Sequence, residues 1–232
     1  MNRDSRKVIA IIAAAGTGKR IGGEFPKQYL KIAGKPILVY TLEKFDGCHA
    51  VGEIILVVEK EKIGLAEGLL EEWEIRKTVH VIAGGVERQD SIHRALGVLP
   101  EQTEWVAIHD GVRPFVSLEK ISEVIQAGQD FGAAILAVPE KNTIKKAVEG
   151  WVEQTISRKD IWEIQTPQVF KAEWLKTSYT RAFKNHYYST DDAALIEQAG
   201  HRVRLVRGEE NNIKITSPAD LIIAKAFAES GY

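Results

Sequence analysis

Uninterrupted apolar runs recur along most of the chain. The five runs are Val8–Ala14, Glu53–Val58, Thr78–Ala83, Trp105–His109 and Ala133–Val138. Apolar residues do not alternate with polar ones in these runs. Each run therefore predicts a strand covered on both faces, as in a largely parallel sheet.

Helical periodicity fills the gaps between the runs. The expected helices are Pro36–Phe45, Glu61–Trp73, Glu87–Leu99, Leu118–Phe131 and, later, Ser217–Glu229. Strands that alternate with helices predict an α/β protein with a Rossmann-like, doubly wound, mostly parallel sheet and right-handed crossovers. Ligands of such sheets bind beyond the carboxyl ends of the strands. The segments AAAGTGKR, AGGVERQDS and HDGVRPF each follow a predicted strand, so we expect the functional site there.

The segment at about 139–170 departs from this alternation. Two short alternating stretches flank Glu149–Gly150, a pattern typical of a hairpin. A long excursion within a compact domain commonly serves as a lid or an oligomer contact. We predict one domain spanning 1–232 with a protruding β-arm at about 139–170. Because a lone hairpin is marginally stable, we expect the arm to embrace a second copy in a two-fold homodimer.

The composition argues against nucleic acid and membranes as partners of this protein. The 232 residues carry a net charge of -1, which gives no global attraction for nucleic acid or an anionic membrane. The lone Cys48 excludes an intramolecular disulfide and suits a reducing compartment. The start MNRDSRKVIAIIAAAG imitates a secretion signal, but its apolar run suits a buried first strand better. We expect a cytoplasmic protein with neither nucleic acid nor membrane as a partner.

The glycine-rich segment AAAGTGKRIGGEFPKQYL indicates a phosphate-binding loop, although neither of two familiar loops fits. In a Walker A loop Ala13 would stand at the first glycine and Arg20 at the Ser/Thr. The dinucleotide motif needs a glycine where Ile21 stands. The small residues of the segment let the backbone approach a nucleotide closely, and Lys19, Arg20 and Lys27 supply the charge that a triphosphate requires. A plain glycine turn remains the alternative.

Several motifs together carry a family resemblance. They are, in chain order, AAAGTGKRIGG with FPKQY, AGGVERQDSI, HDGVRPF, TISRKDIWEIQTPQVF, STDDAALIEQAG and NIKITSPADL. The set resembles the nucleotidyltransferases that act on sugar or polyol phosphates, and among them the 2-C-methyl-D-erythritol 4-phosphate cytidylyltransferase family of non-mevalonate isoprenoid biosynthesis. The resemblance implies an enzyme in which the phosphate of the methylerythritol substrate attacks the α-phosphate of CTP and releases pyrophosphate. Because that nucleophile is already an anion, no general base is required.

The resemblance also implies roles for individual residues. Arg20 and Lys27 would stabilise the transition state. Asp110, at a strand end, would bind Mg²⁺ or another divalent cation, with a helix cap or Asx turn as the alternative reading. Nucleotide binding, with backbone groups reading the cytosine, is implied for Ala14, Ala15, Gly16, Gly18, Gly85 and Ser91. Positioning of the methylerythritol phosphate is implied for Arg113, Thr143, Arg158, Thr166 and Lys214.

Some positions and some rival functions stay open. We interpret His109, Arg88, Asp191 and Asp192 as structural, with Thr190 or Asp191 capping a helix. Val112 and Val86 stand where relatives often have alanine and an acidic residue. One rival is a ribitol-5-phosphate cytidylyltransferase, which shares most of the motifs. The second is a nicotinamide-binding Rossmann dehydrogenase, although this chain lacks the third glycine of the dinucleotide motif. The third is a nucleotide-sensing module without catalysis.

Overall fold

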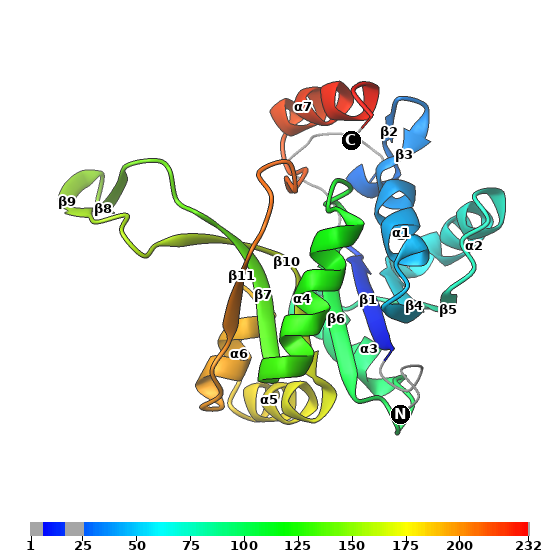
Figure 1. Ribbon diagram of the computed structural model, residues 1–232, viewed down its shortest axis with the longest axis horizontal. Helices are drawn as coiled ribbons and strands as arrows, with labels where there is room; N and C mark the ends of the chain where they lie inside the picture. The colour runs from blue at the N-terminus through cyan, green and yellow to red at the C-terminus, as the bar shows by residue number, and fades with distance from the viewer. Residues whose placement is uncertain (1–6, 17–25, 232) are drawn as a thin grey trace.

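A central sheet of 7 strands organises the computed structural model, which describes residues 7–16 and 26–231 (Figure 1). The strand order is β11(Arg204–Arg207), β7(Ala133–Pro139), β10(Trp162–Lys171), β6(Trp105–Asp110), β1(Val8–Ala14), β4(Val51–Val58) and β5(Thr78–Ala83). β10 runs antiparallel to both of its neighbours, and the other pairs of this sheet are parallel. The predicted mostly parallel α/β sheet is confirmed.

Helices cover both faces of the sheet. One face packs on α1(Ile37–Gly47), α2(Ile63–Glu72) and α4(Leu118–Phe131), and the other on α3(Arg88–Gly97), α5(Ala172–Lys184) and α6(Asp192–Gln198). In β1, Ala10 and Ile12 belong to the first core, whereas Ile9 and Ile11 belong to the second. An apolar run without alternation is what this two-sided burial requires.

A third apolar cluster lies beyond the carboxyl ends of the strands. There α7(Pro218–Glu229) packs near the short pair β2(Lys31–Ile32) and β3(Lys35–Pro36), at the top of Figure 1. Val112 and Phe115, which follow β6, belong to this cluster. Within the described ranges, no helix combines the length and the apolar character needed to cross a membrane.

The order of the strands reverses direction next to β1. The chain passes from β1 to β4 and β5 on one side and then returns to β6 on the other side of β1. Ala13 pairs in register with Asp110, and the Gly111 N–H donates to the Ala13 carbonyl at 2.8 Å. A Cβ at Gly111 would lie 2.9 Å from the Ala14 Cβ, so this close approach requires glycine. Open α/β sheets bind their ligands at such a switch point.

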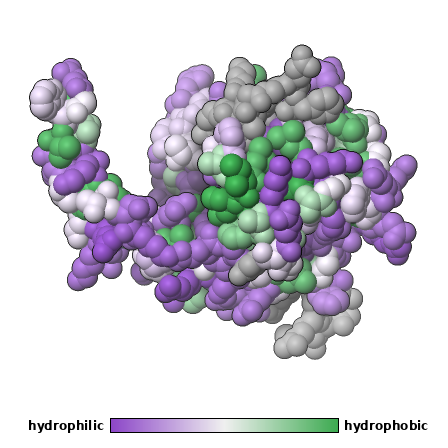
Figure 2. All heavy atoms as spheres, turned by 90° about the horizontal axis from the view of Figure 1, so that it is seen from above, coloured by the Kyte–Doolittle hydropathy of each residue, from purple (hydrophilic) through white to green (hydrophobic). Residues whose placement is uncertain are grey.

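The arm is a two-stranded hairpin that extends away from the body (Figures 1 and 2). β8(Ile144–Val148) pairs with β9(Trp151–Ile156), and the loop between them is Glu149–Gly150, as predicted. Both loop residues have positive φ, 49° and 84°, which is the requirement of a type I′ turn.

The predicted arm is too long at its C-terminal end. Residues 162–170 belong to β10, which lies between β6 and β7 in the central sheet. The sequence did not predict this strand because it contains the polar run QTPQ. Its Gln165 and Gln168 are nevertheless buried. Gln165 donates to the Glu209 carbonyl at 2.8 Å, and Gln168 donates to the Asp191 carboxylate at 3.0 Å. Helix α5 and strand β11 were not predicted.

Candidate active site

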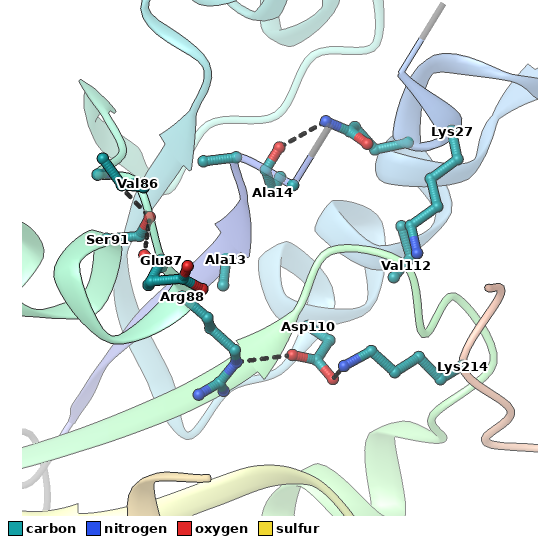
Figure 3. A pocket seen from close by; sticks show the side chains of 14 residues that line it. Ala13, Ala14, Lys27, Val86, Glu87, Arg88, Ser91, Asp110, Val112 and Lys214 are labelled. Carbon is teal, nitrogen blue, oxygen red and sulfur yellow. Dashed lines mark hydrogen bonds and ion pairs between the residues drawn. The ribbon is translucent and has the colours of Figure 1, made fainter. Parts of the chain in front are cut away.

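A cavity of about 300 Å³ opens at the switch point between β1 and β6 (Figure 3). Its walls come from the end of β1, the 3-10 helix Lys27–Tyr29, the turn before α3, the end of β6 and Lys214. The lining residues are Ala13, Ala14, Ala15, Gly16, Lys27, Gln28, Gly85, Val86, Glu87, Arg88, Ser91, Asp110, Val112 and Lys214. The structure thus brings together the predicted nucleotide residues that it describes. Gly18 and Arg20, with Lys19, lie outside the described residues.

The backbone on one side of this cavity is held by side-chain hydrogen bonds. The buried Gln28 amide donates to the Ala14 carbonyl at 2.7 Å. The Ser91 hydroxyl accepts from the Gly85 N–H at 3.0 Å and lies 3.1 Å from the Glu87 carbonyl, to which it donates. Ser91 therefore shapes the turn whose backbone faces the cavity. The turn also leads into the N-terminus of α3, where the helix dipole favours an anion.

Asp110 is the centre of a cluster of charges beside the cavity. Its Oδ1 lies 3.2 Å from Arg88 Nε, and its Oδ2 lies 3.3 Å from Arg113 Nε and 2.9 Å from Lys214 Nζ. In Figure 3, Arg88 and Lys214 approach the carboxylate from opposite sides. Burial alone would raise the pKa of Asp110. The positive charges of Arg88, Lys214 and Arg113 outweigh it and hold that pKa well below its ordinary value, so the group is ionised.

A second cavity of about 300 Å³ adjoins the first. It is lined by Arg88, Asp110, Arg113, Ile164, Gln165, Thr166, Gln168, Thr190, Asp191 and Lys214. Three of these residues, Arg88, Asp110 and Lys214, also line the first cavity. Two compartments therefore meet at a shared charged wall. The predicted substrate residues Arg113, Thr166 and Lys214 all lie here.

Arg113 is more firmly held than the sequence suggested. Besides Asp110, its guanidinium donates to the Asn212 carbonyl at 2.8 Å and to the Ile164 carbonyl at 3.4 Å. The side chain is buried. Arg113 thus contributes a fixed positive charge to the second cavity.

The buried His109 holds residues of the second cavity in place through hydrogen bonds. Its Nε2 lies 3.1 Å from the Arg113 carbonyl, which can only accept, so Nε2 carries the proton. Nδ1 then accepts from the Thr166 hydroxyl at 2.9 Å, and that hydroxyl accepts from the Asp110 N–H at 3.1 Å. Burial lowers the pKa of His109 to about 4, which keeps the ring neutral. These contacts support the structural interpretation of His109.

The arm residues lie away from both cavities. Thr143 and Arg158 are exposed, and Arg158 donates to the Lys141 carbonyl within the arm. Neither residue is among those that line the two cavities. Within the described residues of one chain, these two predicted substrate residues are therefore not near Asp110.

Arg88 and Asp192, both interpreted as structural from the sequence, form an ion pair at the charged wall. Arg88 lines both cavities and pairs with Asp192 at 2.8 Å as well as with Asp110. Asp192 also accepts a hydrogen bond from the Tyr179 hydroxyl. The motif GGVER contains Arg88 and the motif STDDAALIEQAG contains Asp192, but neither motif indicated that the two side chains pair. Asp191 caps α6 as predicted, accepting from the Ala194 N–H at 3.2 Å.

The two valine positions differ. Val112 is 6% exposed and packs with the third apolar cluster while touching the first cavity, so most of its bulk is absorbed by the core. Val86 is 94% exposed at the rim of that cavity.

The donor set suits a divalent cation that arrives with a polyphosphate. No group of three or more His, Cys, Asp or Glu side chains is placed to hold a metal among the residues 7–16 and 26–231. Asp110 has four acceptor positions, of which Arg88, Arg113 and Lys214 occupy three. One position remains, and Mg²⁺ commonly takes one or two carboxylates plus phosphate oxygens. The three cations would repel a bare metal ion, so the phosphates must supply the compensating charge.

Comparisons with known proteins address the family to which the whole chain is similar. The family model described as "IspD: 2-C-methyl-D-erythritol 4-phosphate cytidylyltransferase" matches residues 8–230. The enzymes of that name from Syntrophus aciditrophicus and Geobacillus thermodenitrificans are each 43% identical to the chain, and the matches cover 95% of this chain and 95% and 96% of theirs. A crystal structure of the 4-diphosphocytidyl-2C-methyl-D-erythritol synthase from Anaerococcus prevotii superposes with a TM-score of 0.86 at 33% identity, covering 97% of each chain.

Proposed function

The chain belongs to the 2-C-methyl-D-erythritol 4-phosphate cytidylyltransferase family, and from this premise we propose how its residues divide the work of the reaction. The enzyme couples CTP to 2-C-methyl-D-erythritol 4-phosphate in isoprenoid precursor synthesis. The products are 4-(cytidine 5'-diphospho)-2-C-methyl-D-erythritol and pyrophosphate. The reported matches give no support to ribitol 5-phosphate as the substrate or to a nicotinamide dehydrogenase.

The observation that carries the assignment of roles is the charged wall shared by the two cavities. The first cavity takes CTP, with backbone groups of Ala14, Ala15 and Gly85 at the base. The second cavity takes the methylerythritol phosphate. Two polyanions then meet at the wall of Arg88, Asp110 and Lys214, where the positive charges of Arg88 and Lys214 offset their repulsion and align the attacking oxygen.

Lys27 and Arg20 act on the nucleotide. Lys27 is buried and extends into the first cavity beside Val112 (Figure 3). A cation held in a desolvated position stabilises the charge that develops at the α-phosphate more than it would in water. Arg20, outside the described residues, supplies a second cation from the glycine-rich segment. No side chain needs to remove a proton, because the attacking phosphate is already ionised.

Mg²⁺, or another divalent cation, is the proposed cofactor. Asp110 would hold it through its remaining acceptor position, together with oxygens of the triphosphate. When bound, the metal neutralises and orients the triphosphate. A metal that depends on the triphosphate for its ligands should bind weakly to the protein alone.

The arm supports a homodimer in which substrate sites are completed in trans. A two-stranded hairpin is at best marginally stable in isolation, yet among the described residues β8 and β9 pair only with each other. On this hairpin Trp151 is 82% exposed and Val152 is 62% exposed. A second copy that covers these side chains would also bring Arg158 and Thr143 to its neighbour's second cavity.

The function has a direct test. The protein is incubated with Mg²⁺, each nucleoside triphosphate and either methylerythritol 4-phosphate or ribitol 5-phosphate, and pyrophosphate release is followed. Efficient turnover is expected with CTP and the methylerythritol substrate. Comparable turnover with ribitol 5-phosphate would contradict the assignment of the second cavity. Localisation in the cytoplasm and organisation as a single domain over 1–232 stay predictions.

A further inference from the structure

Arg88 lies between two buried carboxylates that belong to different parts of the fold. Its Nε is 3.2 Å from Asp110 at the end of β6, and one terminal nitrogen is 2.8 Å from Asp192 at the start of α6. The Asp192 side chain is 1% exposed, and the Asp110 side chain is 7% exposed. Tyr179, on α5, donates to the other oxygen of Asp192. A row of polar contacts thus connects the second core to the shared wall of the two cavities.

The three cations around Asp110 are held in different ways. Arg113 is anchored by two main-chain carbonyls, those of Asn212 and Ile164. Arg88 is anchored by Asp192. Lys214 is 38% exposed, and within the described part of the chain its ammonium has no acceptor other than Asp110. Lys214 is therefore the cation best able to leave the carboxylate for an arriving phosphate.

We propose that Arg88 is a positioning residue, clamped by Asp192, that keeps the Asp110 carboxylate oriented when Lys214 turns from Asp110 to the substrate phosphate. The proposal rests on the roles assigned above to Asp110 and Lys214. Asp192 acts only through Arg88, because it lines neither cavity.

The chemistry of the pair suits this role. A guanidinium is a planar fork whose nitrogens point in different directions, so it can bridge two carboxylates at fixed positions, whereas an ammonium is a single point of charge. A buried ion pair seldom adds net stability compared with apolar residues of similar size. The Arg88–Asp192 pair instead has a geometric role, because it fixes the orientation of the Asp110 carboxylate.

The experiment separates positioning from stability. Arg88→Gln, Asp192→Asn and the double variant are compared for kcat, for KM of both substrates and for unfolding temperature. Arg88→Gln should lower kcat roughly 10- to 100-fold, as the loss of a residue that orients a metal ligand commonly does. It should also lower the unfolding temperature, because Asp192 remains buried without its partner. Asp192→Asn should lower kcat less, since Arg88 keeps its contact with Asp110.

The double variant decides the issue. Removing both charges should restore much of the lost unfolding temperature, whereas kcat should stay as low as in Arg88→Gln, because Asp192 has no effect without Arg88. Arg88→Lys keeps the positive charge and should still lower kcat. The matched control is Arg181→Lys on α5, whose arginine donates to the Gln198 carbonyl at the end of α6 and touches neither cavity. Its kcat should not change.

Two results would overturn the proposal. One is recovery of both kcat and unfolding temperature in the double variant, which would make Arg88 a purely structural residue. The other is a normal kcat in Arg88→Gln while Asp110→Asn is inactive. If Asp110→Asn itself is fully active, the assignment of Asp110 in the proposed function has failed, and this proposal fails with it for that separate reason.

Discussion

The charged wall and the arm both carry predicted substrate residues, but the protein holds them in opposite ways. Around Asp110, the side chains of Asp110 and Arg113 are 7% and 8% exposed, and each is fixed by contacts from other elements. Along the arm, Thr143 and Arg158 are exposed, and the hairpin strands pair with no other strand in the described part of the chain. Groups fixed as Asp110 and Arg113 are can stabilise a transition state without rearranging themselves. The arm exposes apolar side chains, and its Thr143 and Arg158 line neither cavity of their own chain.

The strongest way to break the preorganised centre is to remove its carboxylate. Asp110→Asn should lower kcat on the order of a thousandfold, because the remaining cations then have no counter-charge and the proposed metal loses its protein ligand. Pyrophosphate release gives kcat, and circular dichroism checks the fold. Asp130→Asn, on the exposed surface of α4, is the matched control. Near-normal turnover by a folded Asp110→Asn protein would remove Asp110 from the metal site.

The next largest effect should come from the nucleotide cations. Lys27→Ala and Arg20→Ala should each cost about 3 kcal/mol of transition-state stabilisation, or roughly a hundredfold in kcat, with little change in CTP binding. Steady-state kinetics with CTP as the varied substrate separate the two parameters. If one of these variants shows only a raised KM for CTP, its cation serves ground-state binding and the catalytic assignment is wrong for that residue.

Acidification should destabilise the centre through the buried His109. Burial lowers the pKa of His109 to about 4, whereas the unfolded chain binds that proton near its ordinary value of 6.5. Below pH 6.5 the unfolded state therefore holds one more proton than the folded state, and stability falls as the pH falls towards 4. The loss from this group should amount to about 3 kcal/mol at most. Denaturant unfolding between pH 7 and 4 measures it. An NMR titration in which the His109 ring charges near pH 6.5 in the folded protein would contradict the assignment.

Mixing two inactive variants tests the arm, because activity should return if the arm of one subunit completes the site of the other. Arg158→Ala and Lys214→Ala should each be nearly inactive alone. After subunit exchange about half of the dimers are mixed, and one of the two sites in a mixed dimer receives both intact residues. About a quarter of all sites should therefore recover, by the same counting. Proven exchange without recovered activity would show that each arm serves its own subunit.

The local sequence pattern was sufficient to predict the strands that are buried on both faces of the sheet. Val8–Ala14 was recognised as a strand because every residue in it must be apolar to satisfy two cores. Glu149–Gly150 was recognised as a turn because neighbouring residues alone decide its backbone conformation. The motifs after β1 and β6 predicted the position of the candidate site, since the carboxyl ends of parallel strands lie at one edge of the sheet.

Only the tertiary structure decided which polar residues are buried and with what partners. Gln165 and Gln168 resembled surface residues, yet β10 is internal because Glu209 and Asp191 satisfy their amides from elsewhere in the chain. The pairing of Arg88 with Asp192 depends on α3 and α6 lying on the same face of the sheet. Apolar burial requires only the right periodicity, whereas a buried charge requires one particular partner at one particular distance. Periodicity is local and can be predicted from sequence, but that partner is chosen by the packing of elements far apart in the chain.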